Sequence, residues 1–253
     1  MHSRFAPACS SGRASPCLSH VCSGGPMSLS RGRYPARLTL PDIPEDVLER
    51  YRLHWRGEAL HTAPEQFAPL TAAQLFGTDS PLTVDVGCAT GEFVCGLAEL
   101  HPERRFLGIE MSRKPIEHAV VRASGLGLEN IRFLQADVTM VGPLLVPESV
   151  ATFSIHFPVP YTTTHKRKHH TYGPRMLDHY LRALVPGGRI SIVTDSPDVR
   201  QDVQAMMAHE PRLREIAQDG WQLSLDEHLK SPYQRLWEKR GRAIWRAEYE
   251  KQG

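Results

Sequence analysis

The chain has 253 residues, a formal net charge of +2 at pH 7 and 41% hydrophobic residues. This size and apolar content fit one large α/β domain with appendages. The near-neutral charge excludes a polycation, so any surface that binds nucleic acid has to be local. No run approaches the roughly 18 to 20 apolar residues that span a bilayer, so we expect no membrane partner.

The cysteines are odd in number and lack paired C-x-x-C spacing: Cys9, Cys17, Cys22, Cys88 and Cys95. This usage argues against a disulfide framework or a zinc site and fits a reduced, cytoplasmic setting. Histidines cluster between residues 165 and 170, but no carboxylate or cysteine joins them at ligand spacing. We therefore expect no bound metal.

Composition divides the chain into three parts. Residues 1–34 are rich in Ser, Pro, Gly, Cys and Arg and lack periodicity, which predicts a disordered or mis-assigned segment with Met27 as an alternative start. Residues 35–80 are expected to form an N-terminal extension of the domain that follows at 81–253. Basic residues flank Trp55 in this extension, and they fit either a nucleic-acid clamp or a solvated edge with Trp55 packed inward.

The domain is organised around an apolar strand at Thr83–Val86 that runs into a glycine turn and opens a helix. An α/β sheet builds a ligand site in this way. Gly87 and Gly91 can take positive φ and let a ligand approach bare backbone. Glu92 stands where a dinucleotide fingerprint has its third glycine, and an acid there would repel a pyrophosphate. Together with Asp85, this acid suits a cationic ligand instead.

Strand and helix patterns alternate along the chain, which predicts an α/β fold with a doubly wound, mainly parallel sheet. The expected strands are Thr83–Val86, Arg105–Glu110, Asn130–Gln135, Val150–Phe157 and Arg189–Thr194. The expected helices are Pro44–Tyr51, Glu92–Leu100, Ser112–Gly125 and Met176–Leu184. Phe93, Leu97 and Leu100 define the expected apolar face of the second helix. Glu110 ends a strand, and its carboxylate offers the two oxygens that a ribose diol needs.

The pattern Asp-x-Gly-x-Ala-x-Gly, from Asp85 to Gly91, resembles the first motif of class I S-adenosylmethionine (SAM) methyltransferases, with Ala89 for the usual middle glycine. The resemblance implies a Rossmann-like fold, SAM as the cofactor, and a place for Asp85 near its cationic methionine end. Asp137 follows the third strand and resembles the family's contact to the adenine amino group. An Ala-Asp pair is also an ordinary helix cap, so both interpretations of Asp137 stay open.

From about Val84 to Glu248, the order of segments resembles bacterial tRNA (guanine-N7-)-methyltransferase. The segments that carry the resemblance are DVGCATGEF, FLGIE, ENIRFLQAD, FPVPY, LVPGGRISIVTD and WEKRGRAIW. The resemblance implies methyl transfer from SAM to N7 of guanine in tRNA. It also implies that the cofactor is bound by Asp85, Gly87, Gly91, Glu110 and Asp137. The catalytic residues that it implies around the guanine are Asp195 and Glu238.

One position in the expected catalytic pocket departs from that family. The family turn reads Phe-Pro-Asp-Pro-Trp, whereas this chain has Val159 for the aspartate and Tyr161 for the tryptophan. Guanine N7 carries a free lone pair and needs in-line placement rather than a general base. Losing one carboxylate contact to the base would cost on the order of 1–3 kcal/mol. Asp195 and Glu238 could partly cover the role.

Basic residues interleaved with aromatic rings flank the expected pocket, a composition typical of RNA contacts. The expected substrate-binding residues are Tyr161, Lys166, Arg167, Lys168, Arg235 and Arg240, with Trp237 and Trp245 offering flat rings for bases. A solvated helix face is the alternative for these charges. We expect a monomer with tRNA as its partner. The alternatives are a SAM-dependent methyltransferase with a non-tRNA substrate, or a SAM- or RNA-binding protein that has lost turnover.

Overall fold

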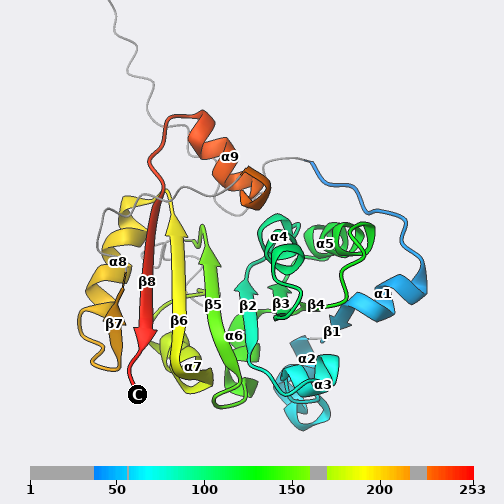
Figure 1. The fold of residues 1–253 in the computed structure, drawn as a ribbon, viewed down its shortest axis with the longest axis horizontal. Coiled ribbons are helices and arrows are strands. Elements are labelled where there is room, and N and C mark those ends of the chain that lie inside the picture. The colour runs from blue at the N-terminus through cyan, green and yellow to red at the C-terminus, as the bar shows by residue number, and fades with distance from the viewer. Residues whose placement is uncertain (1–36, 56, 160–169, 217–226) are drawn as a thin grey trace, which may run out of the picture. The chain divides into compact units, whose positions relative to one another are not determined.

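The computed structural model describes residues 37–55, 57–159, 170–216 and 227–253. In these residues the strands form one sheet in the order β1-β4-β3-β2-β5-β6-β8-β7 (Figure 1). The strands are β1 (Arg52–His54), β2 (Leu82–Val86), β3 (Arg105–Glu110), β4 (Ile131–Gln135), β5 (Val150–His156), β6 (Leu184–Thr194), β7 (Leu213–Glu215) and β8 (Trp245–Lys251). Among the described strands, the pairs that β8 forms with β6 and β7 are antiparallel and the other pairs are parallel, so the predicted mainly parallel α/β sheet is confirmed. The segment expected to be disordered, 1–34, lies outside the described residues.

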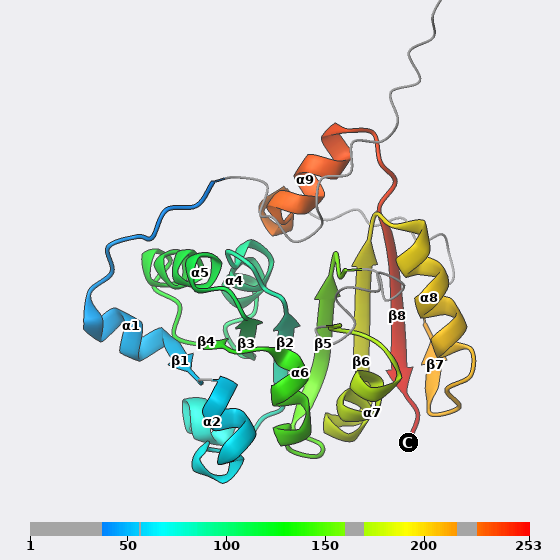
Figure 2. The same cartoon turned by 180° about the vertical axis from the view of Figure 1, so that it is seen from behind.

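Helices cover both faces of this sheet (Figures 1 and 2). The helices are α1 (Glu45–Tyr51), α2 (Gly57–Thr62), α3 (Ala72–Phe76), α4 (Glu92–Leu100), α5 (Arg113–Gly125), α6 (Val138–Val141), α7 (Pro174–Ala183), α8 (Pro197–Met207) and α9 (Pro232–Lys239), with 3-10 turns η1 (Pro64–Gln66), η2 (Gly142–Leu144) and η4 (Glu227–Leu229). One core joins α1, α4 and α5 to β3 and β4, and a larger core lies under α2, α3, α6, α7 and α8. No helix in the described part of the chain is both long and apolar enough to cross a membrane.

Helix α4 has the predicted bounds but buries a different face. Val94, Cys95 and Ala98 are buried, whereas Leu100 is 51% exposed. The reason is the close approach of α5, where a Cβ on Gly91 would lie 2.8 Å from the Cβ of Ala119. Small side chains therefore face α5, and the larger ones turn aside.

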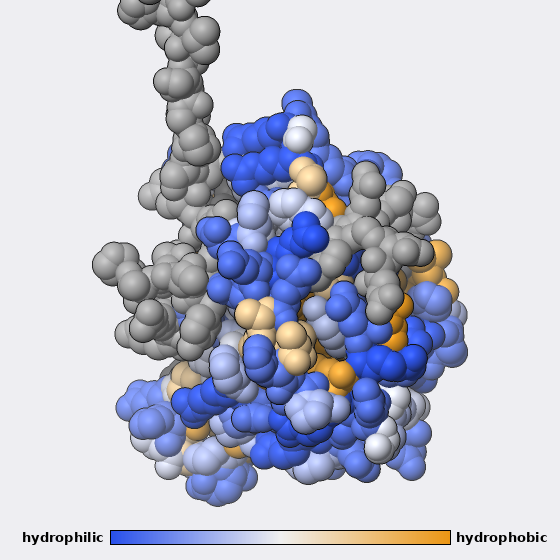
Figure 3. All heavy atoms as spheres, turned by 90° about the vertical axis from the view of Figure 1, so that its left-hand side faces the viewer, coloured by the Kyte–Doolittle hydropathy of each residue, from blue (hydrophilic) through white to orange (hydrophobic). Residues whose placement is uncertain are grey.

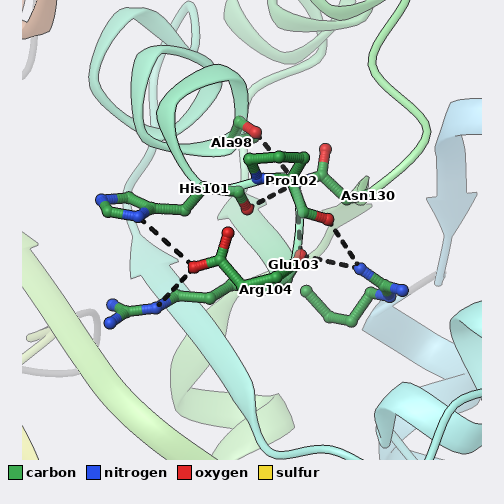
Figure 4. Close-up of polar contacts among 7 residues, drawn as sticks. Ala98, His101, Pro102, Glu103, Arg104 and Asn130 are labelled. Atoms are coloured by element: carbon green, nitrogen blue, oxygen red, sulfur yellow. Dashed lines mark hydrogen bonds and ion pairs between the residues drawn. The ribbon is translucent and has the colours of Figure 1, made fainter.

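Asn130 fixes the connection between α4 and β3 (Figure 4). Its side-chain amide donates hydrogen bonds to the carbonyl oxygens of Ala98, His101 and Arg104, at 2.9, 3.1 and 3.2 Å. These bonds satisfy carbonyls that the end of a helix leaves free. They also set where β3 begins, and hence where its last residue, Glu110, comes to lie.

The C-terminal third of the sheet differs from the prediction. The strand expected to start at Arg189 begins at Leu184 in the structure, and the register shifts where Pro186-Gly187-Gly188 lies within it. The tail then returns as β8, which pairs antiparallel with β6. Helix α9, just before β8, lies beyond the carboxyl ends of β5 and β6 (Figures 1 and 2).

The N-terminal extension contributes to the same sheet, because β1 pairs with β4. Trp55 is buried against Phe67, with ring centroids 4.6 Å apart. Arg52 donates a hydrogen bond to the buried carboxylate of Glu117 at 2.7 Å. The structure thus shows Trp55 packed inward, which is the alternative that needs no nucleic acid.

Candidate active site

Two carboxylates project from the same face of neighbouring strands. Asp85 in β2 pairs with Gly108 in β3, and Glu110 lies two residues further along. Because side chains alternate between the faces of a strand, Asp85 and Glu110 share one face. Asp85 is only 4% exposed, and its carboxylate forms no hydrogen bond with the described residues. Burial, and then the charge of Glu110, raise the pKa of Asp85 to about 8.

Glu110 is held by the backbone around it. One of its carboxylate oxygens accepts a hydrogen bond from the amide of Ser112 at 2.7 Å. Burial raises the pKa of Glu110, and hydrogen bonds from the amides of Ser112 and Ala89 partly offset that rise. The carboxylate therefore has a fixed orientation at the end of β3.

The glycine turn has the backbone that the sequence predicts. Gly87 and Gly91 adopt φ values of 75° and 76°. A Cβ on Gly87 would meet no atom within 4 Å, so this backbone borders open space. Ala89 also has a positive φ, of 50°, a conformation that strains a residue with a Cβ.

Glu92 does not face a ligand, and its interpretation as an acid for a cationic ligand is wrong. Its carboxylate accepts from the hydroxyl of Thr90 at 2.6 Å and from the guanidinium of Arg122 in α5 at 2.9 Å. Arg122 also donates to the backbone carbonyl of Thr90 at 3.2 Å. The acid and Arg122 together brace the glycine turn against α5.

Asp137 forms the helix cap that the sequence left open as an alternative. Its carboxylate accepts from the amide and the hydroxyl of Thr139, at 2.9 and 2.7 Å, at the start of α6. The contact to adenine remains a prediction for this residue.

The two predicted catalytic acids each have a basic partner. Asp195, just after β6, forms an ion pair with Arg242. Glu238 in α9 binds Lys230 at 2.8 Å and accepts from Gln234 at 2.9 Å. Burial disfavours the charged form of Glu238, but the hydrogen bonds from Lys230 and Gln234 outweigh it, and the net effect is a lowered pKa. No contact between the two acids is recorded in the described residues.

Aromatic and basic residues of α9 pack on one another. Trp237 is 7% exposed, and the guanidinium of Arg242 lies 4.1 Å from its ring centroid. The expectation that Trp237 offers a free ring to a base is therefore wrong. Arg240 is exposed beside the same ring, and Arg235 binds Glu227 at 3.0 Å.

The expected basic stretch lies outside the described residues, and so do four predicted substrate contacts: Tyr161, Lys166, Arg167 and Lys168. Val159 is within the described part, where it is partly buried and follows β5. The rest of the FPVPY segment, from Pro160, lies outside that part.

His156 was not among the residues predicted from the sequence. The rule that ligands bind at the carboxyl ends of strands could have identified it. His156 ends β5 two residues after Ser154, the register partner of Asp85, so it projects from the face of Asp85. Its ring packs against Phe93 of α4, with centroids 4.1 Å apart. The next residue, Phe157, has a φ of 51°, which is unusual for a bulky side chain.

The described cysteines and histidines do not form a metal site. Among the described residues, no three His, Cys, Asp or Glu side chains are grouped to hold a metal ion. Cys88 and Cys95 are buried and unbridged. Burial raises the pKa of the Cys88 thiol well above its usual range, so this thiol is not a reactive nucleophile.

Comparisons with known proteins agree with this arrangement. Residues 79–247 match a family model described as a putative methyltransferase. A tRNA (guanine-N(7)-)-methyltransferase of Chloroflexus aggregans is 40% identical over 85% of this chain and 95% of that protein. One of Rubrobacter xylanophilus is 37% identical over 82% and 93%. The solved structure of the 16S rRNA methyltransferase KamB matches with a TM-score of 0.56 at 16% identity, over 71% of this chain and 92% of that one, which supports the fold alone.

Proposed function

The chain belongs to the family of tRNA (guanine-N(7)-)-methyltransferases, and we propose that it transfers the methyl group of SAM to N7 of a guanine in tRNA. The observation that carries the proposal is the pair of carboxylates, Asp85 and Glu110, on one face beside the glycine turn. Acids at neighbouring strand ends, next to bare backbone, suit a nucleoside that also carries positive charge.

The residues at this edge fit SAM. Asp85 is nearly buried, lacks a hydrogen-bond partner among the described residues, and has a pKa of about 8. A cation beside it would stabilise the ionised carboxylate and lower that pKa. Glu110, oriented by Ser112, would accept from the ribose hydroxyls. When bound, SAM supplies an electrophilic methyl group on a sulfonium.

The protein's own part in the reaction is placement and electrostatics. Guanine N7 has a free lone pair, so no residue has to remove a proton before the methyl group is transferred. Positive charge appears on the purine as the bond forms, and fixed acids nearby stabilise it. We propose that Asp195 and Glu238 lie around the guanine and accept from its N1–H and N2–H groups. Each acid has a basic partner at this place, Arg242 for Asp195 and Lys230 for Glu238.

Contact with RNA is proposed for the basic side chains of α9. Lys239 ends α9 and Arg240 follows it, both are exposed, and α9 itself lies beyond the ends of β5 and β6. Arg235, which binds Glu227, would have to exchange that partner for a phosphate. On the face that carries α8 and β7, the described surface is mostly hydrophilic, with small separate hydrophobic spots (Figure 3). A polar surface suits a hydrated polyanion, and phosphate contacts make binding depend on salt.

We further propose that the protein acts as a monomer in the cytoplasm. We also assign the methyltransferase domain to residues 81–253, with 35–80 as an N-terminal extension that adds β1 to the sheet. Both assignments can be tested on the purified full chain by its mass in solution and by limited proteolysis.

Transfer of labelled methyl groups tests the proposed function. The purified chain is incubated with tritiated SAM and unmodified tRNA transcripts, and the RNA is digested to nucleosides. We expect label in 7-methylguanosine, and we expect Asp85→Asn to abolish it. Asp79→Asn, which changes an exposed acid near β2, is the matched control and should keep full activity.

Two other outcomes would replace the proposal. Label that enters a small molecule or a protein, but not RNA, would favour a methyltransferase with a different substrate. Binding of SAM and of tRNA without any transfer would favour a protein that has lost turnover. Both alternatives rest on Val159, because the family resemblance leads us to expect an aspartate at that position.

A further inference from the structure

The imidazole of His156 lies at the end of β5, where the strand order reverses. β2 pairs with β3 on one side and with β5 on the other, and ligands of open α/β sheets bind outside such a point. Val86 pairs with Ile155, so the residues that follow, Gly87 after β2 and His156 at the end of β5, lie next to each other. His156 therefore borders the glycine turn on the side opposite to β3.

Packing and backbone geometry fix this ring. The Phe93 ring contacts one side of it, with centroids 4.1 Å apart and planes at 43°. After His156 the chain turns sharply at Phe157, whose φ is 51° and whose amide donates to the carbonyl of Val193 at 2.7 Å. Strained backbone of this kind persists where the surrounding structure determines it, and such positions cluster at functional sites.

The polar edge of the ring has no partner within the described residues. His156 is partly buried and forms no hydrogen bond with them. On the side away from Asp85, this face carries two serines before the apolar Val193, which pairs with His156. Ser154 precedes His156 on this face, and in β6 Ser191 accepts a hydrogen bond from Arg246 at 3.4 Å. A polar molecule that lies over this edge would meet an imidazole ready to donate or accept.

The charge of the ring is suited to this place. Burial, and then the positive charge of Arg246, lower the pKa of His156 to about 3. The imidazole is therefore neutral, with one nitrogen that donates and one that accepts. In the proposed reaction, positive charge moves from a sulfonium to a purine, and a protonated imidazole would oppose both states. A neutral ring offers a hydrogen bond without that cost.

Building on the proposed function, we propose that His156 is a substrate-binding residue that donates a hydrogen bond from its imidazole to O6 of the target guanine. N7 and O6 are adjacent acceptors on the same edge of guanine. A donor fixed at the strand end would hold O6 and so turn N7 toward the methyl group.

A substrate that lacks O6 tests the contact. Once the modified position is mapped, tRNA is assembled with guanine, 2-aminopurine or hypoxanthine there. The 2-aminopurine base keeps N7 and the N2 amino group but lacks both O6 and the N1–H donor. Hypoxanthine keeps N7, O6 and N1–H but lacks the N2 amino group. The penalty of 2-aminopurine in kcat/KM therefore includes the loss of the N1–H contact, which wild type and the variant His156→Phe share, and the part due to O6 is the difference between them. For wild type this part should be about three- to tenfold, the range for one neutral hydrogen bond.

The variant His156→Phe keeps a ring against Phe93 but removes the donor. It should lose activity on guanine by about three- to tenfold, and its penalty for 2-aminopurine should be smaller than that of wild type by about the same factor. The penalty for hypoxanthine should be equal in both proteins. His156→Gln, which retains an N–H donor, should keep the preference for O6. His179→Phe, the same change on α7 in the other helix layer, is the matched control and should behave as wild type.

An equal penalty for 2-aminopurine in wild type and His156→Phe would overturn the inference, provided that both proteins bind S-adenosylhomocysteine alike. The same penalty in His156→Gln and His156→Phe, both below that of wild type, would show that a donor alone does not suffice and would also overturn it. Failure of the wild type to methylate any tRNA would refute the proposed function itself. These results are distinguishable because each comes from a different protein and substrate pair.

Discussion

The charge of Glu110 adds to burial in holding the pKa of Asp85 at about 8. The two side chains project from one face at adjoining strands, and neither has a cation beside it in the described residues. Like charges placed together in a poorly hydrated site destabilise the ionised form. A cationic ligand would relieve this repulsion, so ligand binding and protonation of Asp85 should be linked.

Binding of SAM should therefore strengthen as the pH rises toward about 8 and should then level off. Below that pH, Asp85 has to release a proton before it can face a cation. Calorimetry in buffers of different ionisation enthalpy should detect release of up to about one proton near neutral pH. Asp85→Asn should bind weakly and without this dependence. An affinity of the wild type that does not change with pH would contradict the linkage.

Without ligand, Asp85→Asn should stabilise the fold at alkaline pH. The carboxyl pKa is about 8 in the folded state, against an ordinary value of 3.8, so the folded state binds more protons between these values. Stability of the wild type therefore falls as the pH rises from about 4 to about 8. Urea unfolding at pH 9 should show a gain of at least about 1 kcal/mol for the variant, roughly the value of one pKa unit. Equal stability at pH 9 would count against the raised pKa.

Removing the brace of the glycine turn should weaken both the fold and the cofactor site. Arg122→Met leaves the buried carboxylate of Glu92 without its ionic partner, which should cost about 1–2 kcal/mol because Arg122 itself is partly exposed. Arg189→Met, which breaks the more exposed pair with Glu250, should cost less than about 0.5 kcal/mol. Thermal unfolding gives both values, and SAM affinity should fall only in the first variant.

Ala89→Gly should stabilise the protein. Ala89 has a φ of 50°, and a residue with a Cβ pays about 1–2 kcal/mol there, which exceeds the entropic cost of glycine in the unfolded chain. We expect a net gain of about 0.5–1 kcal/mol from urea unfolding. Ala98→Gly, in the buried face of α4, should have the opposite sign. A loss of stability at position 89 would show that the strain has been misjudged.

Val159→Asp should raise the rate of guanine methylation. A carboxylate at that position would add a contact to the base, worth on the order of 1–3 kcal/mol, or roughly five- to 150-fold in kcat/KM. Val159→Asn, of the same size but uncharged, should give a smaller gain. No rise with aspartate would indicate that the base lies elsewhere in the pocket.

The sequence was sufficient for the parts of the fold that depend on local pattern. The glycines at 87 and 91, the strand that ends in Glu110 and the bounds of α4 follow from turn chemistry and periodicity. The buried face of α4 did not follow, because it depends on how closely α5 approaches at Ala119. Such an approach is a tertiary fact that no single segment encodes.

The partners of charged and aromatic side chains also could not be predicted from the sequence. The sequence predicted that the carboxylate of Glu92 contacts a ligand. In the structure it pairs with the guanidinium of Arg122, which is distant in sequence. Trp237 was predicted to offer a ring to bases, but it is buried in a cluster with Val193 and Ile244, and the guanidinium of Arg242 lies 4.1 Å from its ring centroid. The antiparallel pairing of β8 with β6 also depends on long-range contacts. The sequence of the tail therefore indicated its basic and aromatic composition but not this strand.

The most direct test of the central claim uses SAM with a deuterated methyl group. The purified chain, an unmodified tRNA transcript and this SAM are incubated together, and the nucleosides are separated by mass. We expect 7-methylguanosine heavier by about three mass units, with an equal amount of S-adenosylhomocysteine, and neither product with Asp85→Asn. Methyl transfer to any other position of the RNA, or no transfer by a chain that binds SAM, would contradict the account.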